Sequence, residues 1–123
     1  IHFKLNIDFT ENKTLSKNDF QQMMNNLIDN SSKYGASQID VSVKINQLIE
    51  IEVSDNGIGI PKEEKNHIFE KYYRITRDEN LNVNGLGVGL FLVKKIVEKY
   101  KGNIEVHSKI KGVSFKINMP NEN

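Results

Sequence analysis

The sequence has no cysteine, no tryptophan and only two prolines among its 123 residues. The absence of cysteine excludes a disulfide framework and a thiolate metal site, and it suits a reducing compartment. Apolar runs are also short: the longest extends from Leu90 to Val93, far below the ~20 residues that span a bilayer. Residues 1–9 alternate between apolar and polar side chains, whereas a signal peptide needs a continuous apolar segment.

The chain also has little net charge. It carries 17 lysines and arginines against 16 aspartates and glutamates, so we expect neither a nucleic acid partner nor attraction to an anionic membrane. The 37% of hydrophobic and 27% of charged residues are typical of a folded protein. The length fits one domain over residues 1–123. Because the chain opens directly in a strand pattern without methionine, we interpret it as a fragment of a longer protein.

Periodicity predicts an alternation of strands and helices. Amphipathic helices are expected at 17 to about 34, at roughly 61–73 and at 88–100, with Ser16 and Asp19 capping the first. Alternating apolar residues predict strands at 3–9, 39–45, 49–53, 104–106 and 113–119. The expected fold class is therefore α+β. It is a two-layer α/β sandwich, with one mixed, mostly antiparallel sheet of about five strands and three helices on one face.

One stripe of the first predicted helix is polar and borders its apolar face. Gln22, Asn26, Asn30 and Lys33 share this stripe at helical spacing. Carboxamide oxygens suit Mg²⁺, and a lysine one turn further on supplies positive charge for phosphates. The alternative is chance alignment, because 16 of the 123 residues are asparagine. Asparagine is a poor helix former, so four of them between positions 18 and 30 favour a specific role.

Two glycine motifs follow. In Asp55-Asn56-Gly57-Ile58-Gly59-Ile60, a carboxylate at a strand end could accept a hydrogen bond from an exocyclic amine, although a plain Asp-Asn-Gly turn explains the motif equally well. Gly85-Leu86-Gly87-Val88-Gly89-Leu90 stands where a loop enters a helix, and such a helix start can bind phosphate. The glycine spacing of this second motif fits neither the dinucleotide-binding fingerprint G-x-G-x-x-G nor a Walker-type phosphate-binding loop.

Together these motifs resemble the Bergerat-type fold shared by histidine kinases, Hsp90, gyrase B and MutL. Four motifs occur in the family's order: an N box at 26–34, a first glycine box at 55–59, an F box at 69–74 and a second glycine box at 85–90. The N and F boxes are similar to those of the ATP-binding catalytic domain of sensor histidine kinases. The resemblance covers essentially the whole chain and implies ATP and Mg²⁺ as cofactors.

The resemblance implies a role for each motif position. Asn30 and Asn26 would hold Mg²⁺, Lys33 would contact phosphate and Arg74 would reach the γ-phosphate, so that Asn26, Lys33 and Arg74 form the catalytic set. Backbone contacts to the phosphates are expected from the second glycine box, namely Gly85, Leu86, Gly87, Val88, Gly89 and Leu90.

The same resemblance implies where adenine would bind. Tyr34 would pack against the base and Asp55 would read its amine, while Gly57, Gly59 and Ile60 would shape the wall of the pocket. Residues 74–86 would form a mobile ATP lid. The chain departs from the family pattern at Ser31, where alanine is usual, at Tyr72, where phenylalanine is common, and mildly at 86–88.

Hydrolases of this fold carry a glutamate where this chain has Asn26, and an amide cannot accept a proton at neutral pH. The resemblance therefore implies phosphoryl transfer from ATP to a histidine on a separate dimerisation domain. His2, His67 and His107 all lack the phosphoacceptor motif, so we expect the fragment to be unable to phosphorylate itself. We also expect the fragment, without its dimerisation domain, to be monomeric. The further partner would be a response regulator. The parent protein is expected to be membrane-anchored, with this domain in the cytoplasm.

Three other functions share these motifs. One is a serine kinase and binding module of the anti-sigma type, which an adjoining histidine-bearing helix upstream would exclude. A second is an ATPase of the chaperone or topoisomerase kind, against which Asn26 and the short lid argue. The third, a module that no longer binds nucleotide, is disfavoured because every motif position keeps a workable residue.

Overall fold

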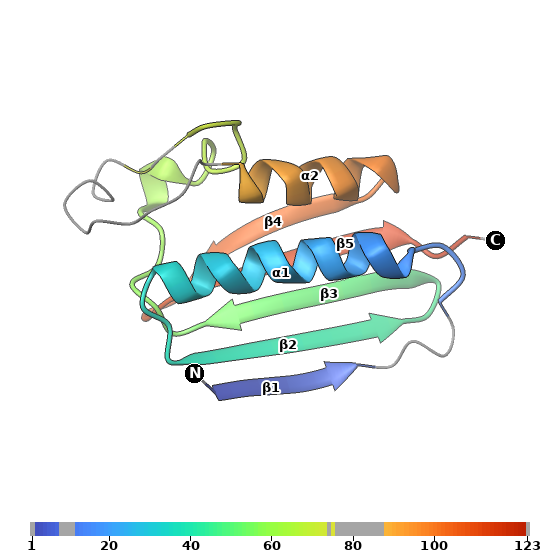
Figure 1. Cartoon of the computed structure of the whole chain (residues 1–123), viewed down its shortest axis with the longest axis horizontal. Helices are drawn as coiled ribbons and strands as arrows, with labels where there is room; N and C mark the ends of the chain where they lie inside the picture. The colour runs from blue at the N-terminus through green and yellow to red at the C-terminus, as the bar shows by residue number, and fades with distance from the viewer. Residues whose placement is uncertain (1, 8–11, 74, 76–87, 123) are drawn as a thin grey trace.

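The computed structural model describes residues 2–7, 12–73, 75 and 88–122, which fold into one sheet covered on one face by helices (Figure 1). In chain order the elements are β1 (His2–Ile7), α1 (Lys17–Lys33), β2 (Gln38–Ile45), β3 (Leu48–Asp55), the 3₁₀ helix η1 (Lys62–Glu64), α2 (Gly89–Lys99), β4 (Asn103–Ser108) and β5 (Val113–Pro120).

The sheet has five strands in the order β1-β2-β3-β5-β4. β1 runs parallel to β2, and the other three pairings are antiparallel. The predicted mixed, mostly antiparallel sheet is therefore confirmed. A short turn at Asn46 and Gln47 joins β2 to β3, and the turn before Val113 joins β4 to β5.

The predicted helix at 61–73 is wrong. Only Lys62–Glu64 is helical, as a 3₁₀ turn, and a series of i+3 backbone hydrogen bonds continues to Tyr73. Ile68 is buried and Phe69 half-buried, but two adjacent apolar residues do not make a helical stripe. Tyr72 has a φ of +67°, which a right-handed helix does not tolerate. The described residues thus contain two α-helices and one 3₁₀ turn in place of three helices.

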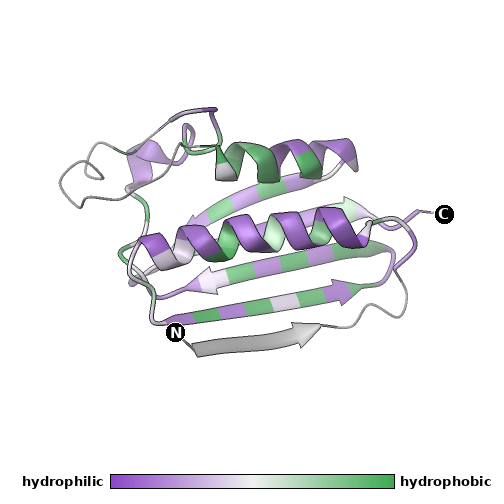
Figure 2. Cartoon of the chain, viewed as in Figure 1, coloured by the Kyte–Doolittle hydropathy of each residue, from purple (hydrophilic) through white to green (hydrophobic). Residues whose placement is uncertain are grey.

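The core lies between the sheet and the two α-helices. Hydrophobic and hydrophilic residues alternate along β2 and β3 (Figure 2), and the alternating apolar residues are buried, apart from the exposed Leu48 at the start of β3. In the register of the sheet, Val41 lies opposite Val53 and Val53 opposite Phe115, which is fully buried. The helices contribute apolar side chains from the same side, among them Met23, Leu27, Val93 and Val97.

The two α-helices run antiparallel, and a polar cluster joins the start of α1 to the end of α2. The Ser16 side chain accepts a hydrogen bond from Asp19 N (3.1 Å), as the capping pattern predicts. The Asp19 carboxylate does not reach back to Ser16 N, which donates to the Tyr100 hydroxyl instead. That carboxylate accepts from Tyr100 Oη and from Lys99 Nζ (2.9 Å), so we call Asp19, Lys99 and Tyr100 the helix latch.

Candidate functional site

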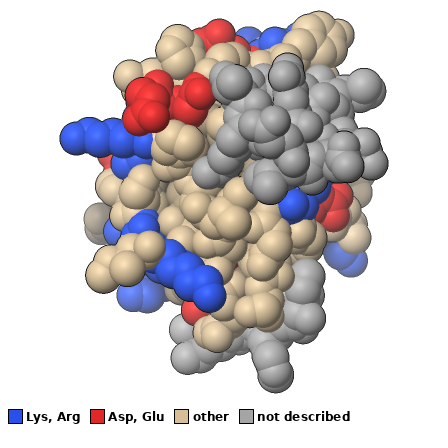
Figure 3. Space-filling model, turned by 90° about the vertical axis from the view of Figure 1, so that its left-hand side faces the viewer, with Lys and Arg blue, Asp and Glu red and all other residues tan. Residues whose placement is uncertain are grey.

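The predicted site residues gather at the opposite end of the helix pair. The C-terminus of α1, the start of α2, the end of β3 and the turn between β4 and β5 all lie at the left of Figure 1. Figure 3 views this end and shows mainly uncharged residues over its described centre, with lysine, arginine, aspartate and glutamate side chains around them. We call this region the site end.

Asp55, the last residue of β3, is the polar centre of the site end, and its side chain is only 4% exposed. Its Oδ1 accepts hydrogen bonds from Gly57 N (3.0 Å) and Val113 N (3.3 Å). Its Oδ2 accepts one from the Ser31 hydroxyl (2.7 Å). Burying a carboxylate is costly unless donors satisfy it, and these three donors come from three different segments of the chain.

The first glycine motif packs against the end of α1. A Cβ at Gly57 would lie 2.7 Å from the carbonyl oxygen of Tyr34, so a side chain at this position would collide with the backbone. The same carbonyl accepts a hydrogen bond from Ile58 N (3.1 Å). Asn56 Oδ1 accepts from the backbone of Ser37, fixing the motif to the segment that links α1 and β2. The glycine is therefore required by close approach of two backbone segments.

The turn between β4 and β5 closes the other side of Asp55. Gly112 has a φ of +98°, and a Cβ there would lie 1.9 Å from Asp55 O. Gly59 also has a positive φ (+78°), and a Cβ added to it would lie 3.0 Å from the carbonyl oxygen of Gly112. Lys109 Nζ donates to Asp55 O (3.1 Å). The end of β3 is thus packed closely by backbone on two sides, at Gly57 and at Gly112, where a side chain would collide.

The polar stripe of α1 meets the start of α2 at Asn26. Asn26 Nδ2 donates to Gln22 O (3.0 Å), and Oδ1 lies 3.2 Å from the position that a Cβ of Gly89 would occupy. The first helical hydrogen bond of α2 runs from Leu92 N to Val88 O, so the earlier N–H groups face outward. The amide oxygen of Asn26 and the positive end of α2 therefore lie side by side.

The other predicted site residues are placed as follows. Asn30 and Tyr34 are half-buried, Lys33 is exposed in the last turn of α1, and Ile60 is buried with its carbonyl oxygen accepting from Ser108 Oγ (3.4 Å). Val88 and Leu90 are half-buried at the start of α2. Four predicted site residues lie outside the described residues: Arg74, Gly85, Leu86 and Gly87.

Sequence reasoning missed two partners of Asp55, namely Ser31 and Val113. Val113 donates through its backbone, and no residue type signals such a contact. Ser31 did carry a signal, because it departs from the family's usual alanine immediately after Asn30. A hydroxyl that replaces a methyl group inside a core needs a hydrogen-bond partner, and Asp55 provides it.

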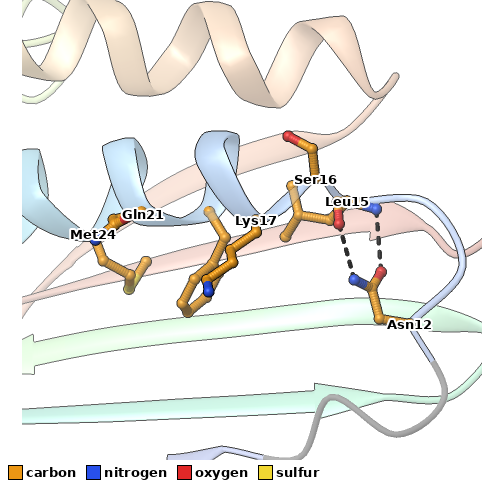
Figure 4. A pocket seen from close by; sticks show the side chains of 7 residues that line it. Asn12, Leu15, Ser16, Lys17, Gln21 and Met24 are labelled. Carbon is orange, nitrogen blue, oxygen red and sulfur yellow. Dashed lines mark hydrogen bonds between the residues drawn. The ribbon is translucent and has the colours of Figure 1, made fainter.

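A separate cavity of about 510 Å³ lies at the other end of α1, beside its N-terminus (Figure 4). Its wall includes Leu15, Phe20 and Met24, and Asn12 closes it through two hydrogen bonds to the backbone of Leu15. None of the predicted site residues lines it.

The described residues hold no group of three or more His, Cys, Asp or Glu side chains that could bind a metal ion, so the magnesium prediction concerns amide oxygens. None of their helices has the length and apolar character required to cross a membrane.

Solved structures of similar fold include histidine kinases. The mycobacterial sensor histidine kinase MprB superposes with a TM-score of 0.77 at 23% identity, covering 98% of this chain and 82% of that one. The catalytic domain of histidine kinase ThkA gives a TM-score of 0.78 at 21% identity, covering 98% of this chain and 80% of the other. At these identities the likeness establishes the fold, and it confirms the predicted fold class.

Curated relatives share a higher sequence identity with this chain than those solved structures do. The signal transduction histidine-protein kinase ArlS of Staphylococcus haemolyticus is 37% identical over 107 residues, which are 84% of this chain and 24% of the relative. ArlS of Staphylococcus aureus (strain USA300) is 36% identical over the same span. The chain thus spans about a quarter of the length of these relatives. Residues 16–123 match the family described as "Histidine kinase-, DNA gyrase B-, and HSP90-like ATPase", and the chain therefore belongs to this family.

Proposed function

We propose that the chain binds Mg-ATP and donates the γ-phosphoryl group to a histidine on a separate dimerisation domain of a two-component sensor kinase. The observation that carries the proposal is the buried Asp55 carboxylate, held by donors from α1, β5 and the glycine motif. The relatives named as histidine-protein kinases favour this function over the anti-sigma alternative.

The proposed roles follow from the chemistry of each group. Asp55 accepts a hydrogen bond from the exocyclic amine of adenine, because an ionised carboxylate is an acceptor only. The outward N–H groups at the start of α2 bind phosphate oxygens. Lys33 contributes charge, and Arg74 reaches the terminal phosphate. Phosphoryl transfer requires mainly positioning and charge stabilisation, which these groups supply.

The asparagines of α1 fit a magnesium ion. Because the Asn26 amide nitrogen is already used by Gln22 O, its oxygen remains as a hard, neutral ligand beside the start of α2. Asn30, one turn further along the same stripe, would supply a second amide oxygen. When bound, the ion neutralises phosphate charge. Neither amide can take a proton from water, so the site holds ATP without activating a hydrolytic water.

Calorimetric titration with ATP and a non-hydrolysable analogue, with and without Mg²⁺, tests the proposal. We expect tighter binding with Mg²⁺, and we expect Asn30→Ala to weaken Mg-ATP binding by about tenfold while leaving metal-free binding nearly unchanged. Asn25→Ala is the matched control, because Asn25 is exposed on the same helix. Undiminished Mg-ATP binding by Asn30→Ala would refute the metal assignment, and no ATP binding by the unaltered chain would refute the proposed function.

A further inference from the structure

Ser31 is a buried polar residue that none of the roles above uses. Its side chain is fully buried (0% exposed) in the last turns of α1, and its hydroxyl donates to Asp55 Oδ2 over 2.7 Å. Its neighbour Ser32 is exposed. A buried hydroxyl with a single short bond to a carboxylate acts on that carboxylate, so its effect must be sought at Asp55.

The hydrogen bonds of Asp55 define what else it can bind. Each carboxylate oxygen accepts about two hydrogen bonds. Oδ1 receives two from backbone N–H groups, and among the described residues Oδ2 receives one, from Ser31. One acceptor position on Oδ2 therefore remains, and the Ser31 bond determines its direction. An amino group can occupy this position, whereas a carbonyl oxygen would face a negative acceptor.

We propose that Ser31 is a positioning residue for base selectivity, directing the remaining lone pair of Asp55 Oδ2 toward the 6-amino group of adenine. This inference rests on the proposed function. The two backbone donors orient Oδ1 alone, so the carboxylate keeps some freedom to tilt about its bond to Cβ. The Ser31 hydroxyl removes that freedom, because it fixes the second oxygen from the side of α1.

The experiment compares the affinities of ATP and purine riboside triphosphate, which lacks the 6-amino group, by calorimetry. We expect Ser31→Ala to reduce the ATP preference about fivefold, the size of one net hydrogen bond. Ser32→Ala, the matched neighbour, should leave the preference unchanged. Ser31→Thr keeps the hydroxyl and should retain the preference, even if its extra methyl group lowers both affinities. Asp55→Asn serves as the reference variant, in which the preference for ATP over purine riboside triphosphate should be lost.

The ratio of the affinities for ATP and purine riboside triphosphate distinguishes two roles of Ser31. A residue that positions Asp55 changes this ratio, whereas a residue that only packs in the core changes both affinities equally. Equal weakening of both ligands in Ser31→Ala, or an unchanged or increased ratio, would overturn the inference while leaving the proposed function intact. Failure of the unaltered chain to bind ATP would overturn both. Loss of the preference in Ser31→Thr, with the hydroxyl present, would also count against the inference.

Discussion

At the scale of single residues, the site end depends on places where no side chain can fit. Gly112 combines a left-handed φ of +98° with a Cβ position 1.9 Å from Asp55 O. Gly35 is a natural comparison, because its φ is +78° but nothing lies within 4 Å of its Cβ position. The two glycines therefore separate the cost of backbone conformation from the cost of a steric collision.

We predict that Gly112→Ala destabilises the fold by about 3 kcal/mol or more, since both strain and collision apply. Gly35→Ala should cost about 1–2 kcal/mol, because strain alone applies. Urea unfolding followed by circular dichroism would measure both. Similar losses in the two variants would contradict the contact seen at Asp55.

The contacts of Asp55 show what residue patterns can and cannot predict. The aspartate and its glycines were identifiable because they form a local motif with known backbone requirements. Ser31 and Val113 are 24 and 58 positions away from Asp55, and only the folded chain brings them to it. Whether the predicted ligand contacts occur at these residues stays a prediction.

At the scale of elements, α1 and α2 are joined by the helix latch. Its Asp19 side chain is 16% exposed, while Lys99 is 64% exposed. The hydrogen bond from the Tyr100 hydroxyl, followed by that from Lys99, lowers the pKa of Asp19 below its ordinary value of 3.8. The same carboxylate raises the pKa of Lys99 above 10.5. Asp19 and Lys99 therefore both carry their charges across the neutral range.

This pKa shift predicts a pH-dependent stability. Because the pKa of Asp19 is lower in the folded state, its contribution is present above pH 3.8 and is lost as the pH falls through the folded value. Asp19→Asn should thus be less stable than the unaltered chain at neutral pH, and the difference should shrink below about pH 4. Urea unfolding over a pH series measures it. A difference that stayed constant with pH would show that the carboxylate charge is not involved.

The predicted elements failed at one place, the segment 61–73. Pro61 and the charged residues after it resemble a helix start, and such local signals predicted the helix. The structure instead uses successive i+3 turns, which let Phe69 reach the edge of the Phe115 ring (6.2 Å between centroids). Tertiary contact of one aromatic residue outweighed local preference. The other predicted helices and strands agree with the structure where it describes them, and residues 8 and 9 of the first predicted strand lie outside the described residues.

At the scale of the whole molecule, two of the three histidines, His67 and His107, have described side chains, and both are exposed. His67 Nδ1 lies 2.7 Å from Glu70 Oε2, and its ring stacks on Tyr73. His107 Nε2 lies 3.1 Å from Glu105 Oε2 on the edge strand β4. Each of these two rings is thus paired with a carboxylate beside it on the surface.

We therefore predict that the chain alone does not transfer phosphate to itself, because its nucleophile must come from another domain. Incubation with γ-labelled ATP should leave the chain unlabelled, and addition of a histidine-bearing dimerisation domain should yield label on that partner. Label on His2, His67 or His107 in the chain alone would contradict the prediction. A variant with all three histidines changed to glutamine would identify any such background.

The helix latch and the site end lie at opposite ends of two antiparallel helices. α1 has 17 residues and is about 26 Å long, and Asn26 lies about 10 Å along the helix axis from Asp19. A substitution in the latch therefore alters how the two helices are joined without touching the contact between Asn26 and Gly89.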